Sequence, residues 1–194
     1  MKVTVEKPKI ITLLYEQEKT DEDYGSCLWA RFYLDLNNFT MSIESDCGNY
    51  TYGWPPTPKT EPFLHLLARM GTDYLLSKIS SETVINGDLT ADGILDFIKD
   101  CAEGECIDLN EEDLESIRDA CYHHDNVRDL VDNVLDEVIS TELRKSLEYD
   151  TDYLYGCIVM DYPANATKIA EVFGNCIKPK IKELLKEEDH GNAP

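Results

Sequence analysis

The sequence predicts an α+β fold, in which an N-terminal antiparallel β-meander precedes a mostly helical, acidic lobe. Residues 9–54 hold four runs rich in β-branched and aromatic residues, with short connections between them. From residue 61 onward the apolar residues recur at helical intervals, and the acidic residues concentrate in this second part. We therefore expect residues 1–80 to form the meander and the first helix, and residues 81–194 to form the acidic helical lobe, the two packed as one compact unit.

The four expected strands are short. Their sequences are KIITLLYE (9–16), CLWARFYLDLN (27–37), FTMSIESD (39–46) and NYTYGW (49–54). In the third run, Phe39, Met41 and Ile43 alternate with polar residues, so these three side chains should share one face of the sheet.

Turn-forming residues separate and end these strands. Tight hairpins are expected at Asn37-Asn38 and at Cys47-Gly48, because Asn and Gly tolerate a positive φ. The segment WPPTP (54–58) then ends the strand structure, because proline has no amide hydrogen to donate to a neighbouring strand.

Three aromatic residues lie near the end of this region at a period of two: Tyr50, Tyr52 and Trp54. A period of two places their side chains on one face of a strand. We favour packing of this face against a helix over residues 61–79, as part of the core, over exposure of the rings as a contact patch.

Helical periodicity is clearest over residues 61–79, where Gly71 is a weak point. Asn110 precedes an acidic first turn and favours a helix start, because its side chain can cap backbone amides and the carboxylates oppose the positive end of the helix dipole. Residues 149–160 could return to the sheet as a strand. Further helices are expected at about 90–102, 111–123, 126–143 and 164–187.

The chain is strongly acidic. Its 194 residues include 18 lysines and arginines against 39 aspartates and glutamates, which gives a formal net charge of −21 and a pI near 4.4. A direct nucleic-acid binder needs a cationic surface, so this composition disfavours one, and it disfavours an anionic membrane surface for the same reason. We expect a basic protein or a cation as the partner. A cytoplasmic location is expected because the sequence has no signal-peptide apolar region and no apolar span of about 18 residues.

The acidic residues are concentrated in residues 82–152, which contain 22 acidic and 5 basic side chains. Like charges three or four residues apart on a helix lie about 5–6 Å from one another and destabilise it by about 0.2–0.5 kcal/mol per pair. This spacing resembles that of phosphates along a nucleic-acid strand, so such rows could occupy a cationic nucleic-acid channel. A solvated face that only keeps the protein soluble, or cation binding, are the alternatives. The candidate partner-binding residues form two rows, Asp88, Asp92, Asp96 and Asp100, and Asp125, Asp129, Asp132 and Asp136.

The seven cysteines have no framework-like spacing, which predicts reduced thiols or metal ligands rather than disulfides. Cys101, Cys106, Cys121 and His124 form a C-x4-C-x14-C-x2-H pattern with the ligand set of a structural zinc site, and His123 competes for the fourth position. Burial of the thiols as small apolar side chains is the alternative. Structural roles are expected for Cys27, Cys47, Cys157 and Cys176.

Sequence motifs give no support for catalysis. The nucleophile-elbow, P-loop, zinc-protease and dinucleotide-binding patterns do not occur in the sequence. His65 lies in the expected apolar helix over residues 61–79, where a histidine is more often part of the core than a catalytic base. We therefore expect no enzymatic activity and assign no catalytic residue.

A resemblance favours a binding function. The segment FYLDLNNFTMSIESDCGNYTYGWPPTPKTEPFLHLLARMGTDYLLSKIS (32–80), with its terminal run YLLSK (74–78), resembles small proteins carried by phages and mobile elements. Together with the acidic lobe, the chain resembles the class of phage-encoded anti-CRISPR inhibitors, many of which are small, acidic and non-enzymatic. The resemblance implies an inhibitor that binds a CRISPR effector nuclease and prevents target DNA from loading. The alternative is a zinc-stapled structural or adaptor protein with an unrelated partner.

Overall fold

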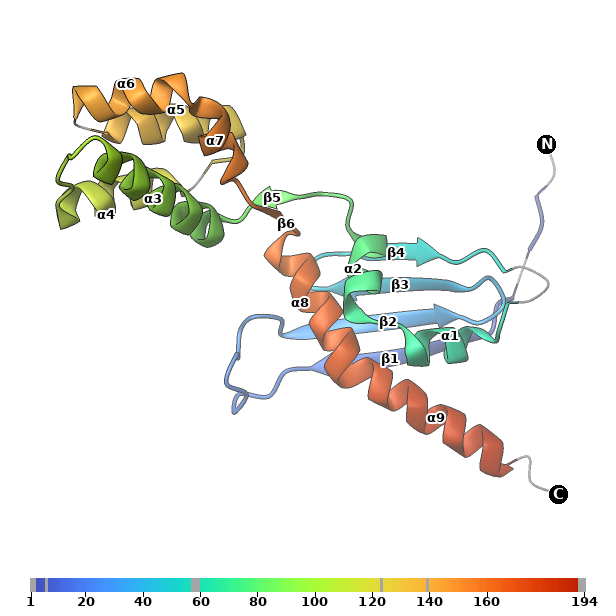
Figure 1. Ribbon diagram of the computed structural model, residues 1–194. Coiled ribbons are helices and arrows are strands. Elements are labelled where there is room, and N and C mark those ends of the chain that lie inside the picture. The colour runs from blue at the N-terminus through green and yellow to red at the C-terminus, as the bar shows by residue number, and fades with distance from the viewer. Residues whose placement is uncertain (1–2, 6, 57–59, 123, 139, 192–194) are drawn as a thin grey trace. The chain divides into compact units, whose positions relative to one another are not determined.

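The structure, a computed structural model, forms two compact units (Figure 1). The sheet unit comprises residues 1–82 and 162–194, and the acidic unit comprises residues 83–161. The fold class is α+β, as expected. The division differs from the one expected at residue 80, because residues 162–194 belong to the sheet unit rather than to the acidic one. The residues that the structure describes are 3–5, 7–56, 60–122, 124–138 and 140–191.

The sheet unit is built on a four-stranded antiparallel sheet, which confirms the expected meander. Its strands lie in the order β1 (Ile10–Glu16), β2 (Trp29–Asp35), β3 (Thr40–Ser45) and β4 (Tyr50–Gly53). In the register of the sheet, Phe32 pairs with Leu13 on one side and with Ile43 on the other. Because residues that pair directly face the same side of a sheet, these three apolar side chains form one continuous row.

One face of this sheet is buried. Along β2 the side chains of Ala30, Phe32 and Leu34 are fully buried, and along β3 so are those of Met41 and Ile43. The residues between them are more exposed. The alternation predicted for the third strand is therefore confirmed.

Helices cover the buried face of the sheet, as Figure 1 shows. Phe173 is fully buried, and its ring centroid lies 6.3 Å from that of Phe32. Full burial of one such side chain contributes about 1.5–3 kcal/mol, so this contact joins the C-terminal helices firmly to the centre of the sheet. The helical segments of this unit are α1 (Phe63–Arg69), α2 (Thr72–Ile79), α8 (Ala164–Val172), the π-helical segment η1 (Phe173–Ile177) and α9 (Lys178–Gly191).

The single helix expected over residues 61–79 is broken into α1 and α2. Met70 has extended backbone at φ −60° and ψ 132°, and Gly71 at φ −78° and ψ 153°. The weak point predicted at Gly71 is therefore confirmed. The carbonyl oxygen of Met70, left without a helical partner by the break, accepts a hydrogen bond of 2.8 Å from Nζ of Lys178.

The aromatic row at the end of β4 belongs to the core. Trp54 is only 8% exposed, and its ring centroid lies 4.7 Å from that of Tyr52 and 5.8 Å from that of Phe63 in α1. Tyr50 is half-buried against the same core. The prediction that this row packs against the helices that follow it is confirmed.

The acidic unit is a group of helices around a separate apolar core. Its elements are α3 (Gly87–Gly104), α4 (Glu111–Ala120), α5 (Val127–Glu137), α6 (Thr141–Tyr149), α7 (Thr151–Gly156), and the short paired strands β5 (Val84–Ile85) and β6 (Met160–Asp161). Its largest fully buried side chains are Ile94, Ile98, Ile117, Leu130, Leu143 and Leu147. Throughout the described part of the chain, each helix is too short or too polar to cross a membrane.

Polar caps set the starts of the helices in the acidic unit. The side chains of Asn86, Asn126 and Ser140 each accept a hydrogen bond from a backbone amide in the first turn of α3, α5 and α6. Asn110 forms a capping box with Asp113 at the start of α4, which confirms the helix start predicted there.

Two sequence-based predictions for this unit are wrong. Residues 126–143 form α5 and α6 rather than one helix, because Val138 takes an extended conformation and Ser140 caps a new helix. Residues 149–160 do not form a strand of the four-stranded sheet, because Thr151–Gly156 form α7 and only Met160 belongs to a strand, the short β6 that pairs with β5. Leu154 is fully buried in the helical core, and this packing outweighs the strand propensity of the neighbouring tyrosines.

We predict that Gly174→Ala destabilises the sheet unit. A Cβ atom at Gly174 would overlap Cγ2 of Thr72 at the start of α2. Overpacking of this kind costs about 1–3 kcal/mol. Thr72→Ser removes the obstructing methyl group, so the double variant should recover most of the loss. Urea unfolding of the wild type, both single variants and the double variant measures this coupling, and additive losses would contradict the contact.

Candidate functional site

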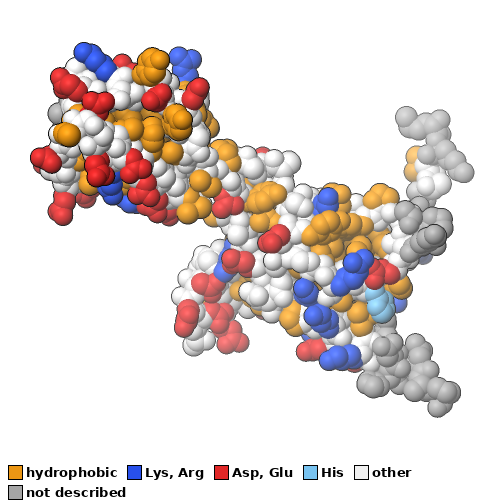
Figure 2. All heavy atoms as spheres, viewed as in Figure 1, with side chains coloured by type: hydrophobic (Ala, Val, Ile, Leu, Met, Phe, Trp, Pro, Cys, Tyr) orange, Lys and Arg blue, Asp and Glu red, His pale blue; other side chains and the backbone are white. Residues whose placement is uncertain are grey.

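The acidic unit carries most of the charge of the chain. Residues 83–161 include 22 acidic and 5 basic side chains, a formal charge of −17 out of −21. Figure 2 shows acidic side chains spread over the visible face of this unit among few basic ones. The rest of the chain carries a formal charge of −4. The strongly acidic part of the sequence therefore coincides with one of the two structural units.

The first aspartate row lies entirely on α3. The helix spans twelve residues between the ends of the row, which corresponds to a line of carboxylates about 18 Å long. Ile94 and Ile98, on the other side of the helix, are fully buried in the core of the unit. The structure thus exposes every member of the row, Asp88, Asp92, Asp96 and Asp100.

Two residues of this row contact α4 and the segment that directly follows it. The hydroxyl of Tyr122 donates a 2.7 Å hydrogen bond to Asp88, and the guanidinium of Arg118 in α4 pairs with Asp92 at 2.8 Å. The side chain of Asp92 nevertheless remains 62% exposed. These contacts hold the carboxylates in place and leave them accessible from solvent.

The second row is shorter than the sequence predicted. Asp129, Asp132 and Asp136 lie on α5, but Asp125 precedes the helix, because the chain turns at Asn126 to cap it. Asp136 pairs at 2.8 Å with Arg144 of α6, and its side chain stays 68% exposed. The row therefore consists of three helical carboxylates and one in the preceding turn.

The four residues predicted to bind zinc are not gathered at one point. Among the described residues, no three of their ligand atoms lie within 4.8 Å of one another. Cys101 lies in the last turn of α3, and Cys106 follows it with a left-handed φ of 55°. Cys121 is buried at the end of α4, where its Sγ donates to the carbonyl oxygen of Ile117 at 3.3 Å. Nε2 of His124 lies 3.0 Å from the carbonyl oxygen of Ala120.

These contacts explain the separation of the predicted ligands. Cys121 packs as a small apolar side chain, the alternative expected from sequence, and burial raises the pKa of its thiol to about 11. His124 bonds to the end of α4 instead of facing Cys121. The competing residue His123 lies outside the described residues.

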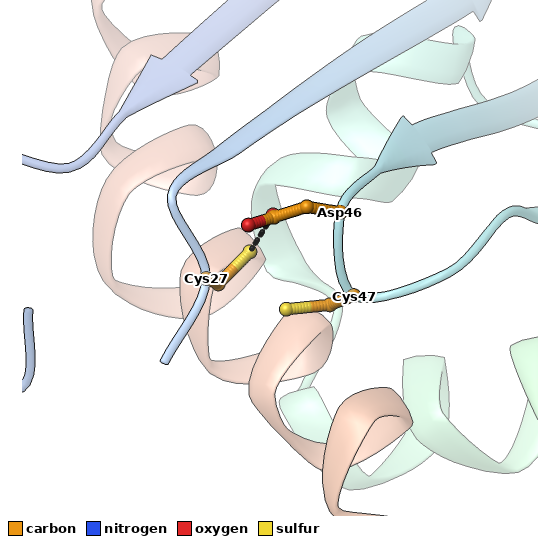
Figure 3. Close-up of side chains that lie close together, drawn as sticks. All are labelled: Cys27, Asp46 and Cys47. Carbon is orange, nitrogen blue, oxygen red and sulfur yellow. Dashed lines mark hydrogen bonds between the residues drawn. The ribbon is translucent and has the colours of Figure 1, made fainter. Parts of the chain in front are cut away.

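The structure instead brings together Cys27, Asp46 and Cys47 in the sheet unit. Their ligand atoms lie within 4.8 Å of one another, and no other such group occurs among the described residues (Figure 3). Sequence reasoning assigned both cysteines purely structural roles. The hairpin expected from the sequence could have predicted this proximity. Two cysteines just outside the paired ends of antiparallel strands lie close together at one corner of the sheet.

An open groove of about 380 Å³ lies elsewhere in the sheet unit and is lined in part by Asp23, Lys168 and Cys176. Lys168 is ion-paired with Asp23, so its charge is already compensated. Burial and the nearby carboxylate of Asp21 raise the pKa of Cys176. Cys176 is therefore a protonated thiol at neutral pH rather than an activated nucleophile.

Comparison with known proteins relates nearly the full length of the chain to a phage protein family. Residues 1–187 match the model of a family described as a phage family. The matched range covers the acidic unit and the sheet unit up to residue 187. No curated protein and no solved structure matched the chain.

We predict that Asp96→Asn stabilises the acidic unit in dilute buffer. Asp96 lies four residues from Asp92 and from Asp100, and each like-charge pair costs about 0.2–0.5 kcal/mol. Denaturant unfolding in dilute buffer should give a higher free energy of unfolding for Asp96→Asn than for the wild type. This difference should disappear in about 1 M NaCl, where the charges are screened. Asp92→Asn is the matched control, because it also removes the Arg118 ion pair and should gain less. A loss of stability for Asp96→Asn at low salt would contradict the prediction.

We also predict that Cys121 makes the acidic unit less stable at high pH. Burial raises the pKa of its thiol from 9.0 to about 11, so the folded form holds this proton more tightly than the unfolded form. The resulting stability is complete below about pH 9 and is lost as the pH rises towards 11. The free energy of unfolding, measured with denaturant at several pH values across this range, should fall more steeply for the wild type than for Cys121→Ala. Parallel curves for the two proteins would show that the thiol does not contribute.

Proposed function

The chain belongs to this phage family, and on that premise we propose that it is a non-enzymatic inhibitor whose acidic unit binds a basic nucleic-acid-handling protein. The partner we favour is a CRISPR effector nuclease, which the chain would prevent from loading target DNA. The single observation that carries the proposal is the exposed aspartate row on α3.

The arrangement of the row supports recognition better than mere solubility. A face that serves only solubility would mix Lys with Glu, which also stabilises the helix through pairs four residues apart. On α3 the row contains four aspartates, and Lys99 is the one basic side chain of that helix. The aspartates therefore repel one another along the helix, which destabilises it, but they give it a continuous line of negative charge.

The ion pairs of the unit fix the rows without removing them as a binding surface. Arg118 and Arg144 tie Asp92 and Asp136 to neighbouring helices, yet both aspartate side chains remain more than 60% exposed. Exposed pairs of this kind contribute only about 0–1 kcal/mol, so a partner's arginines can compete for the same carboxylates. A rigid, accessible array also attracts a cationic partner from a distance.

A nucleic-acid channel is the partner surface that best matches this array. An effector nuclease holds its guide–target duplex in a positively charged channel and recognises the backbone rather than the sequence. Carboxylates about 6 Å apart along α3 offer that channel a comparable line of negative charge. Binding there excludes DNA by occupancy, so the proposed function needs no catalytic residue.

The zinc-stapled adaptor remains the second proposal. Its ligands Cys101, Cys106, Cys121 and His124 are not gathered in the described residues, so the acidic array is the better-supported basis for function.

The test uses the purified effector–guide complex of the phage's host and a fluorescently labelled target duplex. Adding the chain should lower DNA binding in an electrophoretic shift assay, and the inhibition should weaken as salt rises. Replacing all four α3 aspartates by asparagine should weaken inhibition about 30-fold, which corresponds to about 0.5 kcal/mol for each exposed contact.

The matched control separates position from net charge. Glu16, Glu18, Glu22 and Glu82 are exposed in the sheet unit, and replacing them by glutamine changes the net charge by the same amount. This variant should inhibit like the wild type. Equal losses for both variants would reject the α3 row as the binding surface, and unchanged DNA loading at saturating inhibitor would reject the inhibitor function. Circular dichroism confirms that each variant is folded.

A further inference from the structure

Three potential ligands meet at one corner of the sheet unit, at the open end of the β2–β3 hairpin (Figure 3). Cys27 lies two residues before β2, and Asp46 and Cys47 follow directly after β3. Ala30 pairs with Ser45 at the end of the ladder, so the residues beyond this pair continue side by side. The convergence is therefore a direct result of the strand register and does not depend on a flexible loop.

The distances within this group suit a small tetrahedral ion. Sγ of Cys27 lies 3.6 Å from a carboxylate oxygen of Asp46. An ion of the zinc type bonds sulfur at about 2.3 Å and carboxylate oxygen at about 2.0–2.2 Å, which places the two ligand atoms about 3.5 Å apart in a tetrahedron. The pair is thus already at the separation that coordination requires, and Sγ of Cys47 lies within 4.8 Å of both.

Backbone amides hold the carboxylate of Asp46 in position. Its Oδ2 accepts a 2.9 Å hydrogen bond from the amide of Leu28, and its Oδ1 accepts one of 3.3 Å from the amide of Trp29. Although burial opposes it, these amides lower the pKa of Asp46, so the group is a carboxylate at neutral pH. Hydrogen bonds of this kind orient the ligands of metal sites.

The two thiols are buried but stand beside an exposed residue. Cys27 is fully buried and Cys47 is 5% exposed, whereas Asp46 faces solvent. Burial, together with the neighbouring Cys47 and Asp46, raises the pKa of the Cys27 thiol. The thiol of Cys47 donates to the carbonyl oxygen of Ser26 at 3.1 Å, and the thiol of Cys27 lies within donating distance of Oδ1 of Asp46 at 3.6 Å and of the carbonyl oxygen of Trp29 at 3.7 Å. A soft cation can replace these weak thiol hydrogen bonds with stronger metal–sulfur bonds.

We propose that Cys27, Asp46 and Cys47 form a binding site for a thiophilic divalent cation of the zinc class, with water in the fourth position. On binding, both S–H bonds break and two metal–thiolate bonds form, and the two protons pass to solvent. The exposed side at Asp46 admits the ion and the water ligand. The bound ion ties the start of β2 to the end of β3, so it stabilises the sheet unit rather than the acidic one.

The carboxylate distinguishes this site from a disulfide pair. A disulfide between Cys27 and Cys47 needs no third group, and an ionised carboxylate near the sulfurs would only slow attack by a thiolate through repulsion. A cation, in contrast, uses all three groups and offsets their negative charge. The proposal goes beyond the inhibitor function and does not depend on it, because the site and the aspartate rows lie in different units.

The test is a titration of the full-length, reduced and chelator-treated protein with Co²⁺, followed by competition with Zn²⁺. We expect one equivalent to bind, with thiolate-to-cobalt charge-transfer absorption, tetrahedral ligand-field bands and release of two protons for each ion. Zn²⁺ should displace Co²⁺ and raise the unfolding temperature of the sheet unit. Cys27→Ser, Cys47→Ser and Asp46→Asn should each weaken binding by about 100-fold or more, beyond the roughly 10–100-fold effect of altering outer-shell partners.

Matched controls use cysteines outside the cluster. Cys106→Ser alters an exposed thiol, and Cys101→Ser with Cys121→Ser removes the other two thiols of the earlier candidate site, so both proteins should keep the cobalt spectrum. Loss of the spectrum in these controls, but not in Cys27→Ser, would overturn the proposal. So would the lack of charge-transfer bands in protein whose seven thiols all react with an alkylating agent after unfolding. If alkylation instead finds Cys27 and Cys47 joined in freshly purified protein, the pair is a disulfide and the proposal fails. Asp46→Asn keeps both thiols, so it tests the site even if a cysteine variant fails to fold.

Discussion

The register of the β2–β3 hairpin is the constraint on which the sheet unit depends. Phe32 pairs with Ile43 and Leu34 with Met41, so both strands turn their apolar side chains to one face. A slip by one residue would move this whole set to the solvent face and leave the covering helices nothing to pack on. The same register fixes which residues meet beyond the strand ends. The core and the proposed cation site therefore have a common cause.

The acidic unit is subject to a different constraint, because mutual repulsion of its acidic side chains destabilises the folded state. Its formal charge of −17 is distributed over helices whose buried sides share one apolar core. Ion pairs such as Arg118–Asp92 and Arg144–Asp136 join neighbouring helices, but their exposed position limits their contribution to about 0–1 kcal/mol. The helix caps and apolar contacts must supply most of the stability. The aspartates are therefore better explained by what they display than by what they stabilise.

Local sequence patterns predicted which helices and strands form better than they predicted where these elements end and what they pack against. Period-two alternation and the Asn110 cap depend on neighbouring residues alone, and both predictions are confirmed. The break at Val138 and the helical state of α7 depend on packing around residues such as Leu154, which a local pattern does not contain. The hairpin at residues 37–38 shows the same limit, because the positive φ falls on Phe39. There the ring of Phe39 packs 5.2 Å from that of Phe63, a contact between distant parts of the sequence.

The candidate sites show that charge density and ligand convergence are separate properties. The zinc prediction relied on short sequence spacing in a region of high negative charge, yet helix geometry sends Cys121 into the core and leaves Cys106 in a turn. Carboxylates three or four residues apart on one helix stand about 5–6 Å from one another and point outward, and among the described residues no three of them have ligand atoms within 4.8 Å of one another. Antiparallel strands do the opposite, because they bring residues from both ends of a hairpin to one point. A cation site therefore forms more readily in the less charged unit, and the outward rows of the acidic unit suit a large, complementary surface.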